Sequence, residues 1–493
     1  MAQPSVRENY RYRTVYEVFY LLTPIIVTPY IARVLGADLV GIASFTRSAV
    51  TYFTMVGALG TARYGAIEIA KVRDDRQRIS ELFWEIELLS VFTCMLALLA
   101  WLLFAVNGGG YKLYYFCQTP FILSTMMSIS WFFNGQEMMK RIVLRDSAVR
   151  IVVVVCLFMF VRTREDLVKY ILIYSLGQMV GNLSMWLYLP KMLTKVDFRT
   201  LRFKEHLKST MVFFIPTIAT SIYTVLDKTL IGVLTGDPFQ NGYYEQAFKL
   251  IRLVRVFVFS SVNSVMGARM SYLFANGRLD EMKSRINRSM NYILFLGYAC
   301  MFGLISIADT FVPVFFGKGY DGVTPLMRLM APLVVIIGVS SCMDHQYYAP
   351  SGQKKRIISF IFAGAAVNLA FNFALIPRFG AEGAVMGSLV AEVVISVLFV
   401  MNSKEYMDIS RLWKYSWKRI IAGGLMARAV IILGRALETN ALTVILQVCL
   451  GAAVYFLASF IMRDEMLFYI WKQGMNVLRK IIEKNSGKDR GTA

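Results

Sequence analysis

Long apolar stretches separated by short polar connectors run along almost the whole chain. Each stretch is about 17–27 residues long, and a helix needs about 20 mainly apolar residues to cross a bilayer. No connector is long enough to hold a separate soluble domain. The pattern therefore predicts an all-α integral membrane protein with about 14 transmembrane helices. The predicted segments are 15–34, 39–61, 82–106, 113–134, 142–161, 167–189, 211–234, 243–270, 290–316, 325–348, 357–376, 383–401, 417–434 and 442–462.

Composition supports a hydrocarbon environment for these segments. Of the 493 residues, 57% are hydrophobic and only 17% are charged, against about 25% charged in an ordinary soluble domain. The net charge is +21. In a soluble protein such an excess would indicate nucleic acid, but here the charges gather between apolar stretches. Anionic membrane lipids are the expected partners, and nucleic acid is not.

The distribution of Lys and Arg predicts the orientation of the helices. The two termini and every connector from an even to an odd segment together hold 38 of these residues, and the remaining connectors hold seven. Because positive connectors stay in the cytoplasm, both termini are predicted to be cytoplasmic in a multi-pass protein. The first apolar stretch lacks a convincing cleavage site, so we expect no cleavable signal peptide.

A weak internal repeat indicates two related halves. Residues 24–30 read PIIVTPY and residues 216–223 read PTIATSIY. Each is followed by a short connector and then by an apolar helix that carries cations. Repeated halves with a binding site between them are a common plan in transporters. Chance similarity between apolar sequences is the alternative explanation.

Several cations lie inside the predicted membrane segments. Lys249, Arg252 and Arg255 repeat every three residues, which places them on an arc of about 120° over about 9 Å of one helix. Arg47 and Lys228 lie at a similar predicted depth. A cation at the bilayer centre costs at least about 2.5 kcal/mol, so each needs a partner, water or a ligand.

Two interpretations of these cations are open. In the first they line a water-filled cavity between the two halves, where Arg side chains bind phosphate or pyrophosphate through paired hydrogen bonds. In the second they extend to the membrane surface or pair with protein carboxylates. Glu245, four residues before Lys249, is one such candidate carboxylate.

Little else in the sequence indicates catalysis or metal binding. The six cysteines lie in apolar stretches without CxxC spacing, and the two histidines form no cluster. The chain has no GxxxxGK[ST], HExxH or GxSxG motif. We therefore expect a protein that is not an enzyme and has no cofactor, and the sequence identifies no metal.

Five segments of the sequence carry a resemblance to a known family. They are TPIIVTPYIARVLGADLVGIASFTRSAVTYF (23–53), YGAIEIAKVRDD (64–75), FFGKGYDGVTPLMRLMAPLVVIIGVS (315–340), PSGQKKR (350–356) and NFALIPRFGAEGAVMGSLVAE (372–392). The sequence resembles the polysaccharide-unit flippases of bacterial membranes, within the multidrug/oligosaccharidyl-lipid/polysaccharide exporter superfamily.

This resemblance implies both an architecture and an activity. It implies two pseudo-repeated six-helix lobes, 1–209 and 210–403, followed by two extra helices and a basic cytoplasmic tail in 404–493. The implied activity moves undecaprenyl-pyrophosphate-linked oligosaccharide units from the inner to the outer leaflet of the cytoplasmic membrane, by alternating access. The implied substrate-binding residues of a cationic central cavity are Arg47, Lys228, Lys249, Arg252 and Arg255.

A second set of residues comes from similarity to the related lipid II flippases, which carry a sodium site. The corresponding positions here are Asp227, Asn368, Asn372 and Ser388. Only one of them is a carboxylate, which departs from the pattern expected for sodium coupling.

Other functions stay open on the sequence alone. A multidrug/cation antiporter of the same superfamily would be expected to have an acidic, aromatic cavity. A membrane polymerase or ligase acting on the same lipid carrier would need a sizeable outer connector with a catalytic residue. A lipid scaffold or partner-binding protein would not depend on Arg252 or Arg255. A polysaccharide polymerase or glycosyltransferases would be protein partners on the pathway.

Overall fold

The computed structural model of the chain describes residues 6–199, 201–407, 409–473 and 475, and these residues form helices and connectors without any strand. The basic tail predicted at the C-terminus therefore lies largely outside the described residues. The helices of the first half are α1 (Val6–Ala58), α2 (Thr61–Lys71), α3 (Arg76–Val106), α4 (Lys112–Gln118), α5 (Pro120–Met126), α6 (Ser130–Gly135), α7 (Met139–Phe160), α8 (Leu167–Ser184) and α9 (Phe203–Thr235). Short 3₁₀ turns cover Gly109–Tyr111, Arg164–Asp166 and Met185–Lys191.

The second half continues the same pattern. Its helices are α10 (Pro238–Arg255), α11 (Ser261–Ala275), α12 (Leu279–Phe316), α13 (Val323–Met330), α14 (Leu333–Met343), α15 (Lys354–Met401), α16 (Ile409–Ala436) and α17 (Ala441–Ile461). π-helical turns at Val256–Ser260 and Asp344–Tyr348 follow α10 and α14.

Six helical stretches of the described chain are long and apolar enough to cross a membrane, and a bent pair, Pro238–Ser260 with Val265–Ala275, would be a seventh. The six are Leu22–Lys71, Arg76–Val106, Leu279–Phe316, Val323–Tyr348, Lys354–Met401 and Ala441–Ile461. The all-helical membrane fold is thus confirmed. Most predicted segments lie mainly on helical residues, but 113–134 is divided among the short helices α4, α5 and α6, with turns between them. The count of fourteen crossings stays a prediction.

Two of the longest helices each hold two predicted segments, joined at a glycine. In α1 the helix is interrupted at Gly36, where φ is 82°. In α15 it is interrupted at Gly380, where φ is 54°. Glycine adopts such positive φ values without the steric penalty of a side chain. The chain can therefore bend at these two points while both flanking stretches remain helical.

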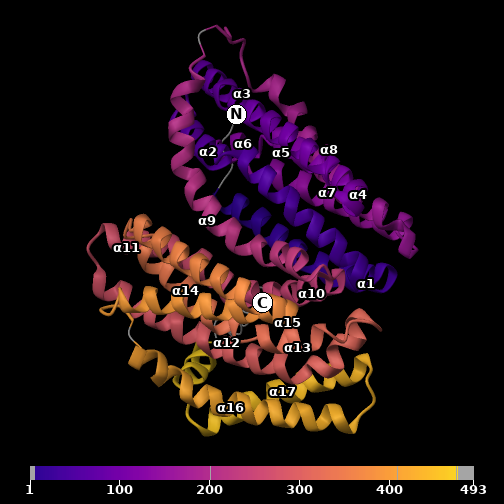
Figure 1. Cartoon of the computed structure of the whole chain (residues 1–493). Coiled ribbons are helices and arrows are strands. Elements are labelled where there is room, and N and C mark those ends of the chain that lie inside the picture. The colour runs from indigo at the N-terminus through magenta and orange to yellow at the C-terminus, as the bar shows by residue number, and fades with distance from the viewer. Residues whose placement is uncertain (1–5, 200, 408, 474, 476–493) are drawn as a thin grey trace, which may run out of the picture. The chain divides into compact units, whose positions relative to one another are not determined.

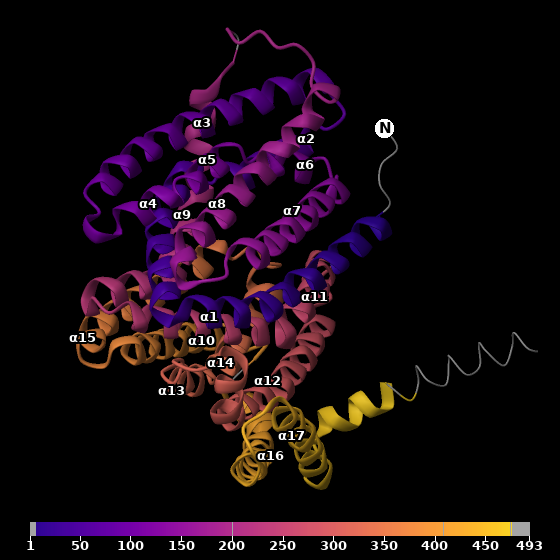
Figure 2. The ribbon, with the colours of Figure 1, turned by 90° about the vertical axis from the view of Figure 1, so that its right-hand side faces the viewer.

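The chain falls into two compact units, which we describe separately. The first contains 1–245, 316–320 and 369–384, and the second contains the remaining residues. In the first unit α8 lies beside α5 and α7 (Figure 2). One of its cores is aromatic and is built by Phe83 of α3 with Trp131 and Phe132 of α6. The predicted lobe boundaries at 209 and 403 remain a prediction.

In the second unit α16 and α17 lie side by side (Figure 1) and pack through Met426, Val430 and Tyr455 against Phe295 of α12. The Tyr455 hydroxyl donates to the carbonyl oxygen of Phe295 at 2.8 Å. These contacts attach the last two helices to the long helix α12.

A buried ion pair also fastens α16 in this unit. Arg419 is 2% exposed and Asp464 is 3% exposed. Arg419 Nε and Nη2 donate to the two oxygens of Asp464 at 2.9 and 3.1 Å. Arg419 Nη1 donates to the carbonyl oxygen of Asn291 on α12 at 2.8 Å. One guanidinium thus joins α12, α16 and the segment after α17.

Two glycines allow α1 and α10 to approach closely within the first unit. A Cβ atom at Gly41 would lie 1.8 Å from the carbonyl oxygen of Pro238, and one at Gly242 would lie 1.9 Å from that of Ala37. Such close backbone approach at small residues is typical of helices that pack in membranes.

Gly41→Ala is therefore expected to force these backbones apart and to destabilise the protein by at least about 1–3 kcal/mol. Thermal unfolding of the purified variant in detergent measures the effect. Gly424→Ala is the matched control, because a Cβ there meets nothing within 4 Å. Equal melting temperatures for the two variants would contradict the close packing.

The connector between α7 and α8 ends in a strongly hydrogen-bonded carboxylate. Lys169 Nζ lies 2.6 Å from Asp166 Oδ1, and the backbone N–H groups of Arg162 and Thr163 each donate to Oδ2 at 2.9 Å. The Lys169 ammonium and then these N–H groups hold the pKa of the Asp166 carboxyl well below its usual value.

A folded pKa below the unfolded value of about 3.9 means that the charge of Asp166 stabilises the protein at neutral pH. That contribution is lost as the pH falls from about 4 through the folded pKa. Asp166→Asn is therefore expected to melt at a lower temperature than the wild type at pH 7. The difference between the two melting temperatures should become smaller below pH 4. The exposed Asp321→Asn serves as control. If the melting temperatures of Asp166→Asn and the wild type differ as much in acid as at pH 7, the charge of Asp166 does not stabilise the protein.

Candidate functional site

Arg47 lies in the second half of α1, inside an apolar stretch long enough to span a membrane. Its guanidinium carbon sits 3.0 Å from the ring centre of Phe121 on α5, a cation–π contact. Nη2 reaches Gln178 Oε1 at 3.5 Å, the outer limit of a hydrogen bond. Nη1 is buried and has no hydrogen-bond partner among the described residues. No described carboxylate lies within ion-pair distance of Arg47, so its charge is not locked to one.

Lys228, on α9 of the same unit, is held differently. Its ammonium forms an ion pair with Glu245 of α10, and Ser44 Oγ donates to the same carboxylate at 2.9 Å. Ser44 lies three residues before Arg47, on the same side of α1. Glu245 is also close enough to Arg47 to attract it electrostatically. One carboxylate therefore lies within the reach of two intramembrane cations.

Lys249, Arg252 and Arg255 all lie on α10, which stays α-helical up to Arg255. The spacing of three therefore produces the stripe that the sequence predicts. Lys249 and Arg255 are half-buried, and Arg252 is exposed. The guanidinium carbon of Arg255 lies 5.9 Å from the ring centre of Phe259, in the π-helical turn that follows.

The five predicted cations thus form two groups. Arg47 and Lys228 belong to the first unit, and the stripe on α10 belongs to the second. For Lys228 the structure supports pairing with a carboxylate. For Arg47 the structure favours the interpretation in which the guanidinium can still bind an anion. Convergence of both groups on one cavity stays a prediction.

The residues predicted for ion coupling occur as two hydrogen-bonded pairs. In the first unit Asp227 accepts from the Tyr244 hydroxyl at 2.5 Å and from Asn372 Nδ2 at 2.6 Å. In the second unit Asn368 Nδ2 donates to Ser388 Oγ at 3.2 Å. All four predicted residues are buried. No group of three or more His, Cys, Asp or Glu able to hold a metal occurs among the described residues. A sodium site on these residues remains untested.

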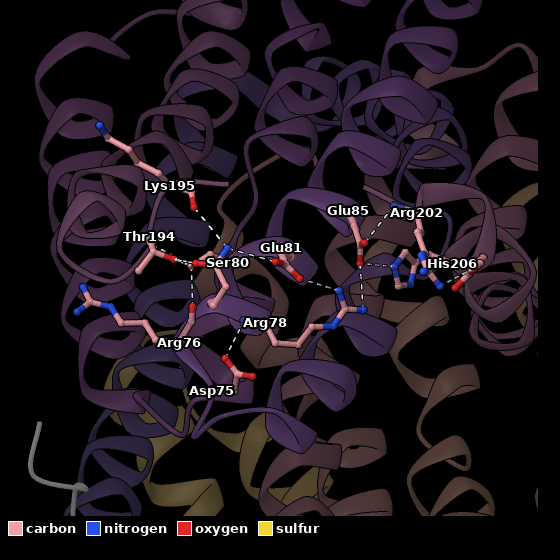
Figure 3. A network of polar contacts seen from close by, with 12 residues as sticks. Asp75, Arg76, Arg78, Ser80, Glu81, Glu85, Thr194, Lys195, Arg202 and His206 are labelled. Atoms are coloured by element: carbon pink, nitrogen blue, oxygen red, sulfur yellow. Dashed lines mark hydrogen bonds and ion pairs between the residues drawn. The ribbon is translucent and has the colours of Figure 1, made fainter. Parts of the chain in front are cut away.

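A polar network joins the start of α3 to the segment that leads into α9 (Figure 3). Glu85 lies at its centre, 1% exposed. It accepts from the backbone N–H of Arg202 at 3.0 Å and contacts His206 Nε2 at 3.0 Å and Arg78 Nη2 at 3.4 Å. Nearby, Ser80 Oγ accepts from the backbone N–H of Thr194 at 2.9 Å. The contacts fasten two connectors that are predicted to be cytoplasmic.

Sequence reasoning passed over a second carboxyl on α3. Glu87 is 1% exposed, and neither of its oxygens has a hydrogen-bond partner among the described residues. The signal in the sequence was a pair of acids, Glu85 and Glu87, near the start of an apolar segment without an adjacent cation. Only the structure shows that Glu85 contacts Arg202, His206 and Arg78, whereas Glu87 has no hydrogen-bond partner among the described residues.

Comparison with known proteins adds a family to this geometry. Residues 6–271, more than half of the chain, match the family described as polysaccharide biosynthesis protein. A putative O-antigen transporter of Escherichia coli (strain K12) is 23% identical over 408 residues, covering 81% of this chain and 98% of that protein. A putative O-antigen transporter of Shigella dysenteriae is 25% identical over 390 residues, covering 78% of this chain and 96% of that protein.

A solved structure also shares the fold. The lipid II flippase MurJ in an inward closed conformation superimposes with a TM-score of 0.75 at 16% identity, covering 92% of this chain and 99% of that one. These matches confirm the resemblance to polysaccharide-unit flippases that the sequence indicated. The chain belongs to the polysaccharide biosynthesis protein family.

Proposed function

We propose that the protein is a flippase for lipid-linked polysaccharide units. In this proposal it moves undecaprenyl-pyrophosphate-linked oligosaccharides from the inner to the outer leaflet of the bacterial cytoplasmic membrane. Support comes from the family match and from relatives named O-antigen transporters that align over most of this chain.

The single observation that carries the proposal is the state of Arg47. An Arg inside an apolar stretch is costly and is retained where it has a task. Among the described residues no carboxylate lies within ion-pair distance of Arg47, Glu245 attracts it only from further away, and its Nη1 is buried without a hydrogen-bond partner. A diphosphate is dianionic or more and offers oxygens that accept paired hydrogen bonds from such a guanidinium. An organic cation would instead be repelled by it.

The proposed mechanism is alternating access through a cationic central cavity. Arg47, Lys228, Lys249, Arg252 and Arg255 neutralise the diphosphate in transit, while the polyprenyl chain stays in lipid. Glu245 forms an ion pair with Lys228 and accepts a hydrogen bond from Ser44. In this mechanism Lys228 binds the diphosphate only after the Glu245 carboxylate has moved away from it. The same proposal includes fourteen membrane crossings, two six-helix lobes and two cytoplasmic termini. It also includes docking of a polymerase or glycosyltransferase.

Deleting the gene in its own bacterium tests the proposed function. We expect lipid-linked oligosaccharide units to accumulate in the inner leaflet and the corresponding surface polysaccharide to disappear, with both effects reversed by the wild-type gene. Unchanged surface polysaccharide without such accumulation would refute the proposal. Loss of resistance to organic cations as the sole effect would favour the antiporter instead.

A further inference from the structure

Glu87 is a carboxyl in the interior of the first unit for which the transport path assigns no task. It lies on α3, about 16 Å along the helix axis from Arg76, within a stretch able to span a membrane. Its side chain is 1% exposed, and both oxygens lack hydrogen-bond partners among the described residues. This is the opposite of Glu85, two residues earlier, whose oxygens contact an imidazole, a guanidinium and a backbone N–H.

An aromatic side chain from another helix lies next to the Glu87 carboxyl. The Trp131 indole N–H on α6 lies close enough to attract the carboxylate, although the contact does not meet hydrogen-bond geometry. That indole stacks on Phe83, one turn before Glu87, with ring centres 5.6 Å apart. The Trp131 ring also packs directly against Gly65 of α2, where an added Cβ atom would lie 2.4 Å from the ring. Glu87 therefore lies at the point where α2, α3 and α6 meet.

The charged groups on the elements packed against α3 are engaged elsewhere or exposed. On α2, Glu68 pairs with Lys71 at 2.6 Å. On α1, Arg47 stacks on Phe121. On α9, Lys228 pairs with Glu245. Also on α9, His206 contacts Glu85, and Asp227 accepts from Tyr244 and Asn372. Exposed charged groups on these elements include Arg33 of α1, Arg63 of α2, Lys112 of α4, and Glu205 and Lys208 of α9. The Cys94 thiol, two turns further along α3, lies close enough to Glu87 to interact with it electrostatically.

An ionised carboxylate in such a place would lose its hydration and receive no cation from the described residues in return, with only the Trp131 indole N–H beside it. That state costs many kcal/mol, whereas the neutral acid costs far less. The packing of α2, α3 and α6 around Glu87 is therefore compatible with the protonated acid and strongly opposes the charged one.

We propose that Glu87 is a proton-binding site whose occupancy is coupled to the conformational cycle of the transporter. One proton from water forms an O–H bond on the carboxylate and removes its negative charge, which permits the packed arrangement described here. Release of the proton restores the charge and favours an arrangement in which water reaches α3. This deepens the proposed function, on which its transport consequence rests, by naming the proton as the coupling ion.

The first test measures the proton itself and needs no substrate. Infrared difference spectra of the purified protein at neutral pH are expected to show the carbonyl stretch of a protonated carboxyl, which disappears in Glu87→Gln. The control variant Glu81→Gln replaces the Arg78-paired acid of the same helix and should keep the band. A band that persists unchanged in Glu87→Gln would overturn the proposal.

The second test measures coupling in proteoliposomes that contain a polyprenyl-pyrophosphate-linked oligosaccharide. A pH gradient at fixed membrane potential is expected to change the translocation rate of the wild type at least about fivefold. In Glu87→Gln the ratio of rates with and without the gradient should fall to about one. Glu87→Asp retains a titrating carboxyl and should keep part of the response. Gradient dependence that survives in Glu87→Gln would overturn coupling at this site.

The two tests also separate this proposal from the proposed function. If the wild type moves no lipid-linked oligosaccharide but the infrared band is lost in Glu87→Gln, the proton site stands and the flippase assignment falls. If the wild type moves the substrate and the band belongs to another residue, the flippase assignment stands and Glu87 as the proton site falls.

Discussion

Arg47→Gln is expected to slow translocation of a pyrophosphate-linked lipid by about 10- to 100-fold. In the described structure Glu245 attracts the guanidinium only from beyond ion-pair distance, and Nη1 has no hydrogen-bond partner. A hydrogen bond between charged groups contributes about 1.5–3 kcal/mol, and each 1.4 kcal/mol corresponds to a factor of ten. The initial rate of head-group appearance in the outer leaflet of proteoliposomes, at low substrate, measures this effect.

Two further variants sharpen the Arg47 prediction. Arg47→Lys keeps the positive charge but loses the planar pair of donors, so an intermediate rate is expected. Arg33→Gln removes an exposed Arg from the same helix and should leave the rate near that of the wild type. If Arg47→Gln and Arg33→Gln behave alike, Arg47 has no role in binding the diphosphate.

Arg419→Ala is expected to destabilise the protein by about 3–5 kcal/mol, the usual effect of removing one partner of a buried ion pair. The change leaves Asp464, 3% exposed, charged and without its two guanidinium hydrogen bonds. It also removes the hydrogen bond from Arg419 Nη1 to the Asn291 carbonyl oxygen. Thermal unfolding in detergent, followed by tryptophan fluorescence, measures the loss.

A double substitution and a matched control test the origin of that loss. Arg419→Met combined with Asp464→Leu removes both charges, so it should cost less than the sum of the two single changes. Arg428→Met replaces an exposed Arg on the same helix and should change the melting temperature little. Additive effects of the two single changes would show that the pair does not act as a unit.

The helices of this protein could be predicted because hydrophobic length alone determines which segments enter a membrane. The helix break at Gly36 lies in the predicted gap between segments 15–34 and 39–61. The break at Gly380 lies in the predicted gap between segments 357–376 and 383–401. The stripe of Lys249, Arg252 and Arg255 also followed from helical spacing, since it lies on one helix.

The partners of the intramembrane charges could not be predicted in the same way. Spacing along one helix suggested Lys249 as a partner for Glu245, but it gave no sign that Lys228, seventeen residues earlier on another helix, forms an ion pair with this carboxylate. Phe121 and Gln178, which contact Arg47, are far from it in sequence. Contacts of this kind depend on how helices pack, which a hydropathy pattern does not specify.

The most direct test of the central claim is the leaflet-to-leaflet rate of a polyprenyl-pyrophosphate-linked oligosaccharide in proteoliposomes that contain either the wild type or Arg252→Glu. Arg252 lies at an exposed position in the middle of the cationic stripe, so its charge is reversed with little effect on packing. We predict rapid translocation by the wild type and a rate close to that of protein-free liposomes for Arg252→Glu. Translocation by folded Arg252→Glu at the wild-type rate would contradict transport along this cationic stripe.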